Sequence, residues 1–554
     1  MAEYGRPRDP ERASPMAESP PEDPPEVPAR DGGRLLKSTG VVGGMTLISR
    51  ILGLVRDVVL ARVFGAGMAM DAFTIANKIP NLLRRFFAEG AFAQAFVPVF
   101  SDYRSNRPEA EGRLLADHVA GALGLVVFIV TLIGVVAAPV LVFVVAPGFA
   151  SNGERFDLSV DMLRWTFPYL LFISLTAMAG GILNSHGRFW VPAFTPVFLN
   201  LVLISAAVWV APRMDEPAMA LATGVFVAGI VQLAFQVPAL RAIRMLPRPR
   251  LNLRHPGVRR VGKLMVPALF GSSVAQINVI FDNIIASFLV TGSVSWLYYA
   301  DRLMEFPLGV FGIALATVIL PGLSRHHAHG DTAGFVATLD HALRLTVLIA
   351  VPAALGLVLL ATPMIATIFL GGAFGPADVS MAAFALAAYG IGLPGFILVK
   401  VLAPAYFSRQ DTRTPVKVAV VALVVNMVLN VVFVLTLLRL SIDGAHAGLA
   451  AATSCAAFLN AGLLYAGLVR GGFFRAHGGW GVLAVRVAIA AALMSVSLLW
   501  LRDLPGSWTE LALFERIAWL ALAVIGGAAV YFAVLFGTGF RVRHLHGKSP
   551  AGSL

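Results

Sequence analysis

Charged side chains lie inside apolar runs that are long enough to cross a bilayer. The first run, near residues 41–63, contains Arg50 and Arg56, and Asp57 follows directly. A cation deep in a membrane helix costs at least about 2.5 kcal/mol on insertion scales, so these side chains need a purpose. The second run, near residues 70–100, carries five more ionisable residues: Asp71, Lys78, Arg84, Arg85 and Glu89. A helix with that density of charge must face water or protein.

A third charged run, near residues 294–325, contains Asp301, Arg302 and Glu305. The surplus of cations over the three runs indicates an anionic substrate. Arginine suits this role because its guanidinium can bond two phosphate oxygens at once. We therefore predict that Arg50, Arg84 and Arg302, which lack an obvious neighbouring acid in the sequence, bind an anionic group.

Three other arginines have competing interpretations. Arg56, next to Asp57, can form an internal ion pair that only stabilises the helix bundle. Arg62 and Arg85 can extend along apolar surface to a membrane interface instead of binding a ligand. The sequence leaves both alternatives open.

An oxygen-rich set of side chains occurs in three later apolar runs. Asp282 lies in the seventh run, Asn426 and Asn430 lie one turn apart in the eleventh, and Thr453 lies in the twelfth. Hard oxygen ligands suit Na⁺ or a proton relay. The alternative is that the asparagines only form hydrogen bonds between helices.

The elements that position these residues are membrane helices. Of the 554 residues, 58% are hydrophobic and 13% are charged, and the mean hydropathy is +0.79. This composition excludes a sizeable water-soluble domain and predicts an all-α polytopic membrane protein. Apolar runs of spanning length indicate about fourteen transmembrane helices. They lie near residues 41–63, 70–100, 117–146, 158–184, 191–211, 218–240, 259–290, 294–325, 336–361, 380–407, 414–437, 445–469, 482–501 and 513–538.

The net charge of +12 is concentrated in alternate loops. Residues 241–263, between the sixth and seventh runs, contain eight Lys and Arg residues, whereas the loop with Asp378 contains none. This is the positive-inside pattern of membrane proteins and not a nucleic-acid groove. We therefore expect both termini in the cytoplasm.

The chain resembles itself at a shift of 223 residues, which aligns Ser185 with Ser408 and Pro192 with Pro415. The repeat predicts two six-helix lobes of the same membrane orientation, related by a pseudo-two-fold axis along the membrane normal, plus two C-terminal helices. Chance matching of Pro and Ser in a biased sequence is the alternative.

The predicted domain boundaries follow from this repeat. The N-terminal lobe covers residues 35–245, the C-terminal lobe 246–475, and the two additional helices 476–540. Residues 1–34 and 541–554 are expected to be cytoplasmic tails, because the first 30 are rich in Pro and Glu and have no apolar clustering. The lone Cys455 excludes an intramolecular disulfide.

Three long motifs resemble the MurJ (MviN) family of lipid II flippases. The stretches 49–57, 78–98 and 293–307 are similar to the family's first, second and eighth helices, and the resemblance runs from about residue 35 to the end. It implies the MOP exporter fold, in which two lobes surround a cavity and two C-terminal helices form a groove for an undecaprenyl tail. The tail of residues 1–30 lies outside the family pattern and is expected to be dispensable.

The resemblance implies a transporter and not an enzyme. The expected activity is to move undecaprenyl-pyrophosphate-linked peptidoglycan precursor, lipid II, from the cytoplasmic to the periplasmic leaflet of the bacterial inner membrane by alternating access. The residues implied for head-group binding are Arg50, Arg56, Arg84 and Arg302, accompanied by Asp57, Asp71, Lys78, Glu89 and Glu305. Some members bind Na⁺, and Asp282 falls at the matching acidic position; Na⁺, H⁺ and membrane potential are the candidate driving forces, and no other cofactor is implied. The implied partners are lipid II, membrane lipids and the cell-wall synthesis machinery, and no nucleic acid.

Two other functions remain as alternatives. A MOP exporter of another lipid-linked oligosaccharide or of a drug would share the fold but need a different cavity. An intramembrane enzyme acting on a polyprenyl lipid would need a general base, metal ligands or a nucleophile at the interface. The sequence contains no HExxH motif or Asp-rich metal loop, which argues against the enzyme.

Overall fold

The computed structural model describes residues 30–89 and 91–541; the side chains of residues 30–42, 89, 268–275 and 313 are outside that description, as are the tails 1–29 and 542–554. The helices of the described chain are joined by turns and loops, and the described residues form no β-strand, only one isolated bridge between Gly371 and Phe374. In chain order the helices are α1 (Arg30–Phe64), α2 (Met68–Arg84), η1 (Arg85–Glu89), α3 (Ala91–Asn106), α4 (Glu109–Val136), α5 (Ala138–Val145), η2 (Pro147–Ser151), α6 (Gly153–Thr166), α7 (Tyr169–Ser185), α8 (Trp190–Ser205), η3 (Ala206–Val210), η4 (Ala211–Arg213), α9 (Met219–Ala242), α10 (Pro256–Ser287), α11 (Ser293–Pro307), η5 (Leu308–Gly312), α12 (Ile313–Ala328), α13 (Thr332–Leu359), α14 (Ala361–Phe369), α15 (Pro376–Phe407), α16 (Arg413–Arg439), α17 (Ala447–Arg470), α18 (Trp480–Asp503) and α19 (Leu513–Gly537).

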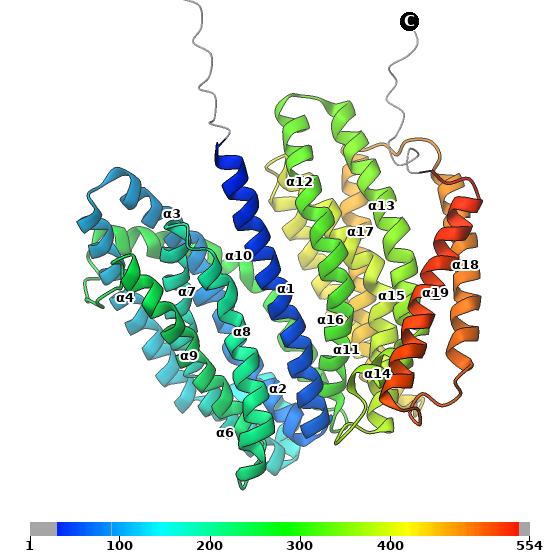
Figure 1. The fold of residues 1–554 in the computed structure, drawn as a ribbon, viewed down its shortest axis with the longest axis horizontal. Coiled ribbons are helices and arrows are strands. Elements are labelled where there is room, and N and C mark those ends of the chain that lie inside the picture. Colours follow the sequence, from blue (N-terminus) through cyan, green and yellow to red (C-terminus); the bar gives the residue numbers. More distant parts are fainter. Residues whose placement is uncertain (1–29, 90, 542–554) are drawn as a thin grey trace, which may run out of the picture.

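These helices form two lobes that lie side by side (Figure 1). The first lobe contains α1 to α9 and the second contains α10 to α17, while the α18–α19 pair flanks the second lobe through α13 and α14. Helix α10 contacts both lobes, because it packs on α3 of the first and on α16 of the second. α1 begins and α19 ends at the same end of the molecule (Figure 1).

The helix boundaries repeat at the 223-residue shift found in the sequence. α4 begins at Glu109 and α13 at Thr332, and α8 begins at Trp190 and α16 at Arg413. The π-helical segments that follow α2 and α11, η1 and η5, keep the same spacing. Because π-turns are rare, their recurrence at one fixed spacing is not explained by chance matching of Pro and Ser. The two lobes are therefore copies of one helical unit.

Eleven helical stretches of the described residues are long and apolar enough to cross a membrane. The three remaining predicted spans, near 41–63, 70–100 and 259–290, are also helical. The first two carry several charged residues each, and the third includes side chains outside the description. The count of fourteen therefore stays a prediction.

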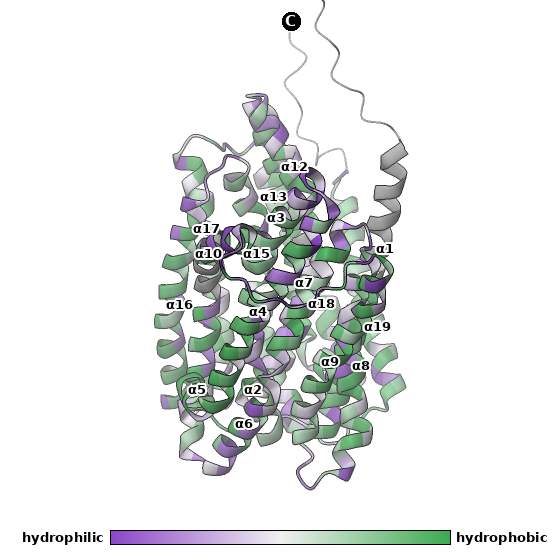
Figure 2. Cartoon of the chain, turned by 90° about the vertical axis from the view of Figure 1, so that its left-hand side faces the viewer, coloured by the Kyte–Doolittle hydropathy of each residue, from purple (hydrophilic) through white to green (hydrophobic). Residues whose placement is uncertain are grey.

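The packing suits a lipid environment. Small residues let helices approach closely: a Cβ added at Gly395 of α15 would lie 2.9 Å from the backbone nitrogen of Phe458 in α17. Large apolar side chains point outward instead, as does Val136, which is 74% exposed. Figure 2 shows hydrophobic residues along the flanks and hydrophilic ones mostly at the two ends.

One end of the interface between the lobes is closed by direct contacts. The backbone nitrogen of Ala373 donates to the carbonyl of Arg62 at 2.8 Å, and the Tyr299 hydroxyl donates to the carbonyl of Gly65 at 3.2 Å. These contacts join the last turn of α1 and the residues that follow it to α11 and to the loop before α15. The closed end lies opposite the end at which α1 begins (Figure 1).

Candidate functional site

A cavity of about 890 Å³ lies between the lobes. Its walls include α1, α2 and η1 from the first lobe and α10, α11, α15 and α17 from the second. Among the described residues, its acidic and basic side chains are Arg56, Lys78, Arg84, Arg85, Arg302, Asp282, Asp301 and Glu305. The five cations outnumber the three carboxylates, and every charge from the first lobe is positive. The cavity is therefore electrostatically suited to an anionic group.

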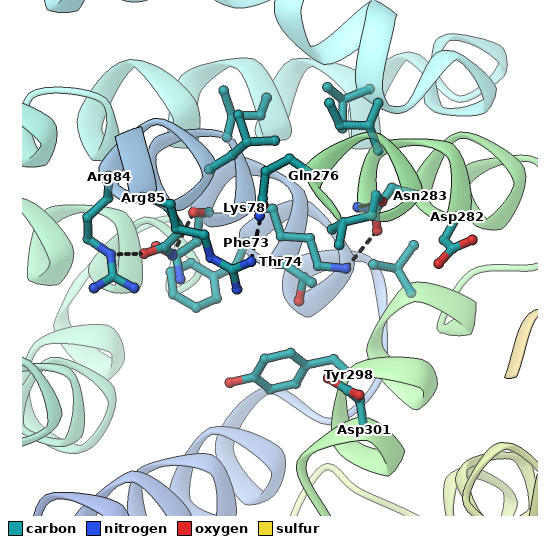
Figure 3. A pocket seen from close by; sticks show the side chains of 18 of the residues that line it. Phe73, Thr74, Lys78, Arg84, Arg85, Gln276, Asp282, Asn283, Tyr298 and Asp301 are labelled. Atoms are coloured by element: carbon teal, nitrogen blue, oxygen red, sulfur yellow. Dashed lines mark hydrogen bonds between the residues drawn. The ribbon is translucent and has the colours of Figure 1, made fainter. Parts of the chain in front are cut away.

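The first-lobe cations reach toward α10. Lys78 Nζ donates to Asn283 Oδ1 at 2.7 Å, and Arg85 Nη1 donates to Gln276 Oε1 at 3.2 Å. Figure 3 shows Lys78, Arg84 and Arg85 on one side of the cavity, with Tyr298 and Asp301 across from them. Arg85 thus lines the cavity instead of extending to an interface.

Arg84 is positioned by its own helix. Its Nε donates to Asn81 Oδ1 at 3.1 Å, three residues earlier on α2. The π-helical turn η1 begins directly after Arg84, and such turns are frequent at functional sites. The structure places Arg84 on the cavity wall, and its predicted binding of an anionic group stays a prediction.

A network of side chains joins α1 to α11. Arg56 donates from Nε and Nη2 to Asp57 Oδ1 at 2.9 and 2.7 Å, and Tyr298 Oη donates to the same oxygen at 2.8 Å. Arg56 Nη1 also donates to Asn200 Oδ1 at 3.1 Å. The internal ion pair that was the alternative for Arg56 is therefore present, although Arg56 also lines the cavity.

Arg302 is paired with two acids, contrary to the expectation from the sequence. Its Nε lies 3.2 Å from Asp57 Oδ2, and its Nη1 donates to Glu305 Oε2 at 3.2 Å. The Arg302 side chain is nevertheless 38% exposed, whereas that of Arg56 is 11% exposed. Arg302 therefore keeps more surface available to a ligand than Arg56 does.

Four predicted head-group residues are not on the described cavity wall, and Asp57, which lies in the network between α1 and α11, is one of them. Arg50 is exposed, and its guanidinium lies against Gly309 of η5, where an added Cβ would be 2.6 Å from Arg50 Nη1. Asp71 is fully buried at the closed end and accepts from the backbone nitrogens of Gly292 and Ser295 at 2.8 and 2.9 Å, so it caps the start of α11 instead of facing the cavity. The side chain of Glu89 lies outside the description.

The four residues predicted as a cation site lie together on α10, α16 and α17. Asn430 Nδ2 donates to Asp282 Oδ1 at 2.6 Å, and Asn426 Nδ2 donates to Thr453 Oγ1 at 3.5 Å. Asn278, which the sequence analysis did not name, donates to Asp282 Oδ2 at 3.2 Å. The interhelical hydrogen bonds that were the alternative are thus present, but they do not use all the polar atoms of this cluster.

Three amide oxygens of this cluster are buried and have no hydrogen-bond partner in the described part of the chain: those of Asn278, Asn426 and Asn430. An unsatisfied buried acceptor costs about 1–3 kcal/mol. Because these oxygens accompany a carboxylate, a hard monovalent cation such as Na⁺ fits the donor set.

Sequence reasoning missed the polar side of α10. Gln276 and Asn283 bond the first-lobe cations, and Asn278 bonds Asp282. The available signal was the presence of four polar residues, at positions 276, 278, 282 and 283, within one predicted span.

Comparison with known proteins gives consistent matches. Residues 60–519 match the family model described as lipid II flippase MurJ. A protein of Vibrio cholerae serotype O1 named probable lipid II flippase MurJ is 47% identical over 519 residues, which cover 92% of this chain and 98% of that protein. The solved structure titled "Lipid II flippase MurJ, inward closed conformation" matches with a TM-score of 0.73 at 26% identity, over 89% of this chain and 99% of that one. An inward-facing multidrug resistance MATE family transporter of the MOP superfamily matches with a TM-score of 0.60 at 13% identity, over 78% and 98%, and shares the fold.

Proposed function

The chain belongs to the MurJ family of lipid II flippases, and we propose that its interlobe cavity holds the anionic head group of lipid II while the lipid crosses the membrane. The protein is a multi-pass membrane transporter and not an enzyme. Lipid II carries a pyrophosphate between its polyprenyl tail and its sugar-peptide head. The pyrophosphate is the group that a cationic cavity recognises.

The observation that carries this proposal is the convergence of Lys78, Arg84, Arg85 and Arg302 on one cavity between the lobes. The cavity volume is in the range of sites that enclose small ligands. Such a site shields the charged head group from hydrocarbon, which would otherwise impose a cost of many kcal/mol on an isolated ion. The polyprenyl tail needs no such shielding and stays in lipid.

The cavity residues have different tasks. Arg84, Arg85 and Arg302 offer planar guanidinium donors, and Lys78 offers a flexible ammonium. Asp57 contacts Arg56, Arg302 and Tyr298, so it orients donors from two helices without contacting an anion itself. Glu305 bonds Arg302 from the following turn of α11 and helps to fix its direction.

We further propose that the structure is the inward-facing state of an alternating-access cycle. Both chain ends would then be cytoplasmic, in keeping with the loop charges, and the closed end would face the periplasm. Delivery of the head group to the periplasmic leaflet would require the contacts of Ala373 and Tyr299 with the end of α1 and the residues that follow it to break. Contact with the cell-wall synthesis machinery would follow on that side.

Na⁺ is the driving ion that the donor set suits best. Asp282, Asn278, Asn426, Asn430 and Thr453 are the residues that would hold it, and the bound ion would neutralise Asp282. The competing proposals are that protons, or the membrane potential alone, drive transport.

The proposal is tested by replacing Arg84 and Arg302, and separately Arg50, with Ala and with Lys. Losing one charge-assisted hydrogen bond should remove about 1.5–3 kcal/mol, roughly ten- to a hundredfold in affinity. Lys should not restore function, because it keeps the charge but loses bidentate geometry. The measurements are membrane abundance, growth after flippase depletion, and lipid II translocation.

Arg164→Ala is the matched control, because Arg164 is an exposed arginine paired with Asp161 away from the cavity. Normal growth and translocation by the Ala variants of Arg84 and Arg302 would remove these arginines from head-group binding. Translocation of a different lipid-linked oligosaccharide, with none of lipid II, would favour the MOP exporter alternative.

A further inference from the structure

Lys78 connects the two lobes at the cavity wall. Its ammonium, on α2, donates to Asn283 on α10 at 2.7 Å (Figure 3). Asn283 is 4% exposed, and its own amide nitrogen donates to the carbonyl of Val279 at 2.7 Å. That second bond fixes the amide orientation, so the Asn283 oxygen is held toward Lys78.

The neighbouring residue on α10 belongs to the cation cluster. Asp282 bonds Asn430 of α16 and Asn278 of its own helix. Two consecutive residues of one helix therefore contact the head-group cavity and the oxygen cluster. The carboxylates of Asp301 and Asp282 both attract Lys78 electrostatically.

We propose that Lys78 couples occupancy of the oxygen cluster by Na⁺ to binding of the anionic head group. While Asp282 keeps its negative charge, Lys78 is held toward α10. A cation at Asp282 cancels that carboxylate's share of the attraction, so the ammonium is held less tightly and becomes available to the pyrophosphate. This inference rests on the proposed function, because it takes the cavity as the head-group site.

The sign of the coupling follows from charge. The Asp282 carboxylate attracts both the Lys78 ammonium and Na⁺. The nearby ammonium therefore lowers the affinity for Na⁺, and bound Na⁺ weakens the attraction that holds Lys78. An anion that draws Lys78 away removes this competition and must raise Na⁺ affinity, and linkage requires the reverse effect to be equal. Coupling between sites is typically about 5- to 150-fold in affinity.

The experiment measures Na⁺ affinity on the purified full chain in detergent. Thermal unfolding is followed while NaCl replaces choline chloride at constant ionic strength. Lys78→Gln keeps a hydrogen-bonding group and removes the charge, so it should raise the apparent Na⁺ affinity about tenfold, within the usual range of coupling. Lys78→Met is a second neutral variant, and Lys78→Arg, which retains the charge, should not raise the affinity. Lipid II should raise Na⁺ affinity in the unaltered protein and not in Lys78→Gln.

Arg85→Gln is the matched control. Arg85 is also a cavity cation bonded to α10, but its partner Gln276 lies six residues, about 9 Å along the helix, before Asp282. Unchanged Na⁺ affinity in both neutral Lys78 variants would overturn the coupling. A complete lack of response to Na⁺ in the unaltered protein would overturn it together with the cation site. The lipid II assignment is read separately, from growth and translocation of the Arg84 and Arg302 variants.

Discussion

Replacing Asp57 with Asn tests how much of the cavity charge is structural. Asp57 is 1% exposed and lies at the centre of the network that joins α1 to α11. It accepts from Arg56 at 2.7 Å and from Tyr298 at 2.8 Å, and Arg302 lies 3.2 Å away. The substitution keeps the shape of the side chain and removes its charge.

The expected loss of stability is large because Arg56 is only 9% exposed. Removing one partner of a buried ion pair costs about 3–5 kcal/mol. The Asn oxygen still accepts a hydrogen bond, which restores about 1 kcal/mol. We therefore expect Asp57→Asn to lower the free energy of unfolding by about 2–4 kcal/mol.

A double-mutant cycle isolates the pair. Arg56→Gln combined with Asp57→Asn should cost about 1–3 kcal/mol less than the sum of the single changes, because no buried charge is then left alone. Arg302→Gln is the control: its side chain is 38% exposed, so its pair with Asp57 is partly screened by water and should contribute below about 1 kcal/mol.

The assay is chemical unfolding of purified protein in detergent, followed by tryptophan fluorescence, with lipid II translocation measured in parallel. A cost of less than about 1 kcal/mol for Asp57→Asn, or additive single changes, would refute the reasoning. Arg56 would then count as a ligand-binding residue and not as part of the helix-joining network.

Four further predictions follow from separate parts of the molecule. Asp282→Asn should abolish stabilisation of purified protein by Na⁺ relative to choline, and a preserved Na⁺ effect would place the ion elsewhere. A periplasmic reporter should be inactive after Arg543 and active in the loop at Asp378; the opposite pattern would reverse the topology. Burial, together with the nearby His118 and Arg107, lowers the pKa of His255, so folding favours neutral His255 and stability should fall as pH drops below the ordinary value of 6.5. His255→Asn keeps a cap on the Gly257 nitrogen and should reduce this loss, as measured by unfolding midpoints at pH about 7.5 and 5.5; an unchanged pH profile would contradict it. Deletion of residues 1–29 should leave growth complementation intact, and its loss would give the tail a function.

Contacts across the lobes account for what the sequence analysis could not place. Asp71 and Lys78 are seven residues apart on one charged helix, yet Asp71 is buried against the start of α11 and Lys78 lines the cavity. Two helical turns put both residues on nearly the same side of α2. The position of α11 along that side of α2 therefore decides that Asp71 is a buried helix cap and that Lys78 lines the cavity.

The polar residues of α10 illustrate the same limit. Gln276 and Asn283 read as isolated amides in an apolar run, and their partners Arg85 and Lys78 lie about 200 residues earlier in the chain. Arg302 was expected to lack a neighbouring acid, and its contact with Asp57 spans the two lobes; its other partner, Glu305, is three residues later on the same helix and was visible in the sequence. Sequence spacing carries no information about pairs that span the lobes.

The sequence by itself determined the membrane environment, the helical fold and the internal repeat. The hydropathy of a span and the repeated positions of Pro and Ser can be recognised along the chain without knowing which residues are neighbours in the folded protein. The sequence also identified most of the charged residues within the membrane spans, because a charged side chain in a membrane helix costs free energy whatever its neighbours are. Tertiary structure alone decided which of these charges face the cavity, which are neutralised in ion pairs, and which amide oxygens near Asp282 remain unpaired. These outcomes depend on the packing of α10 and α11 against the first lobe, since burial and charge pairing are set by neighbours that lie far away in the chain.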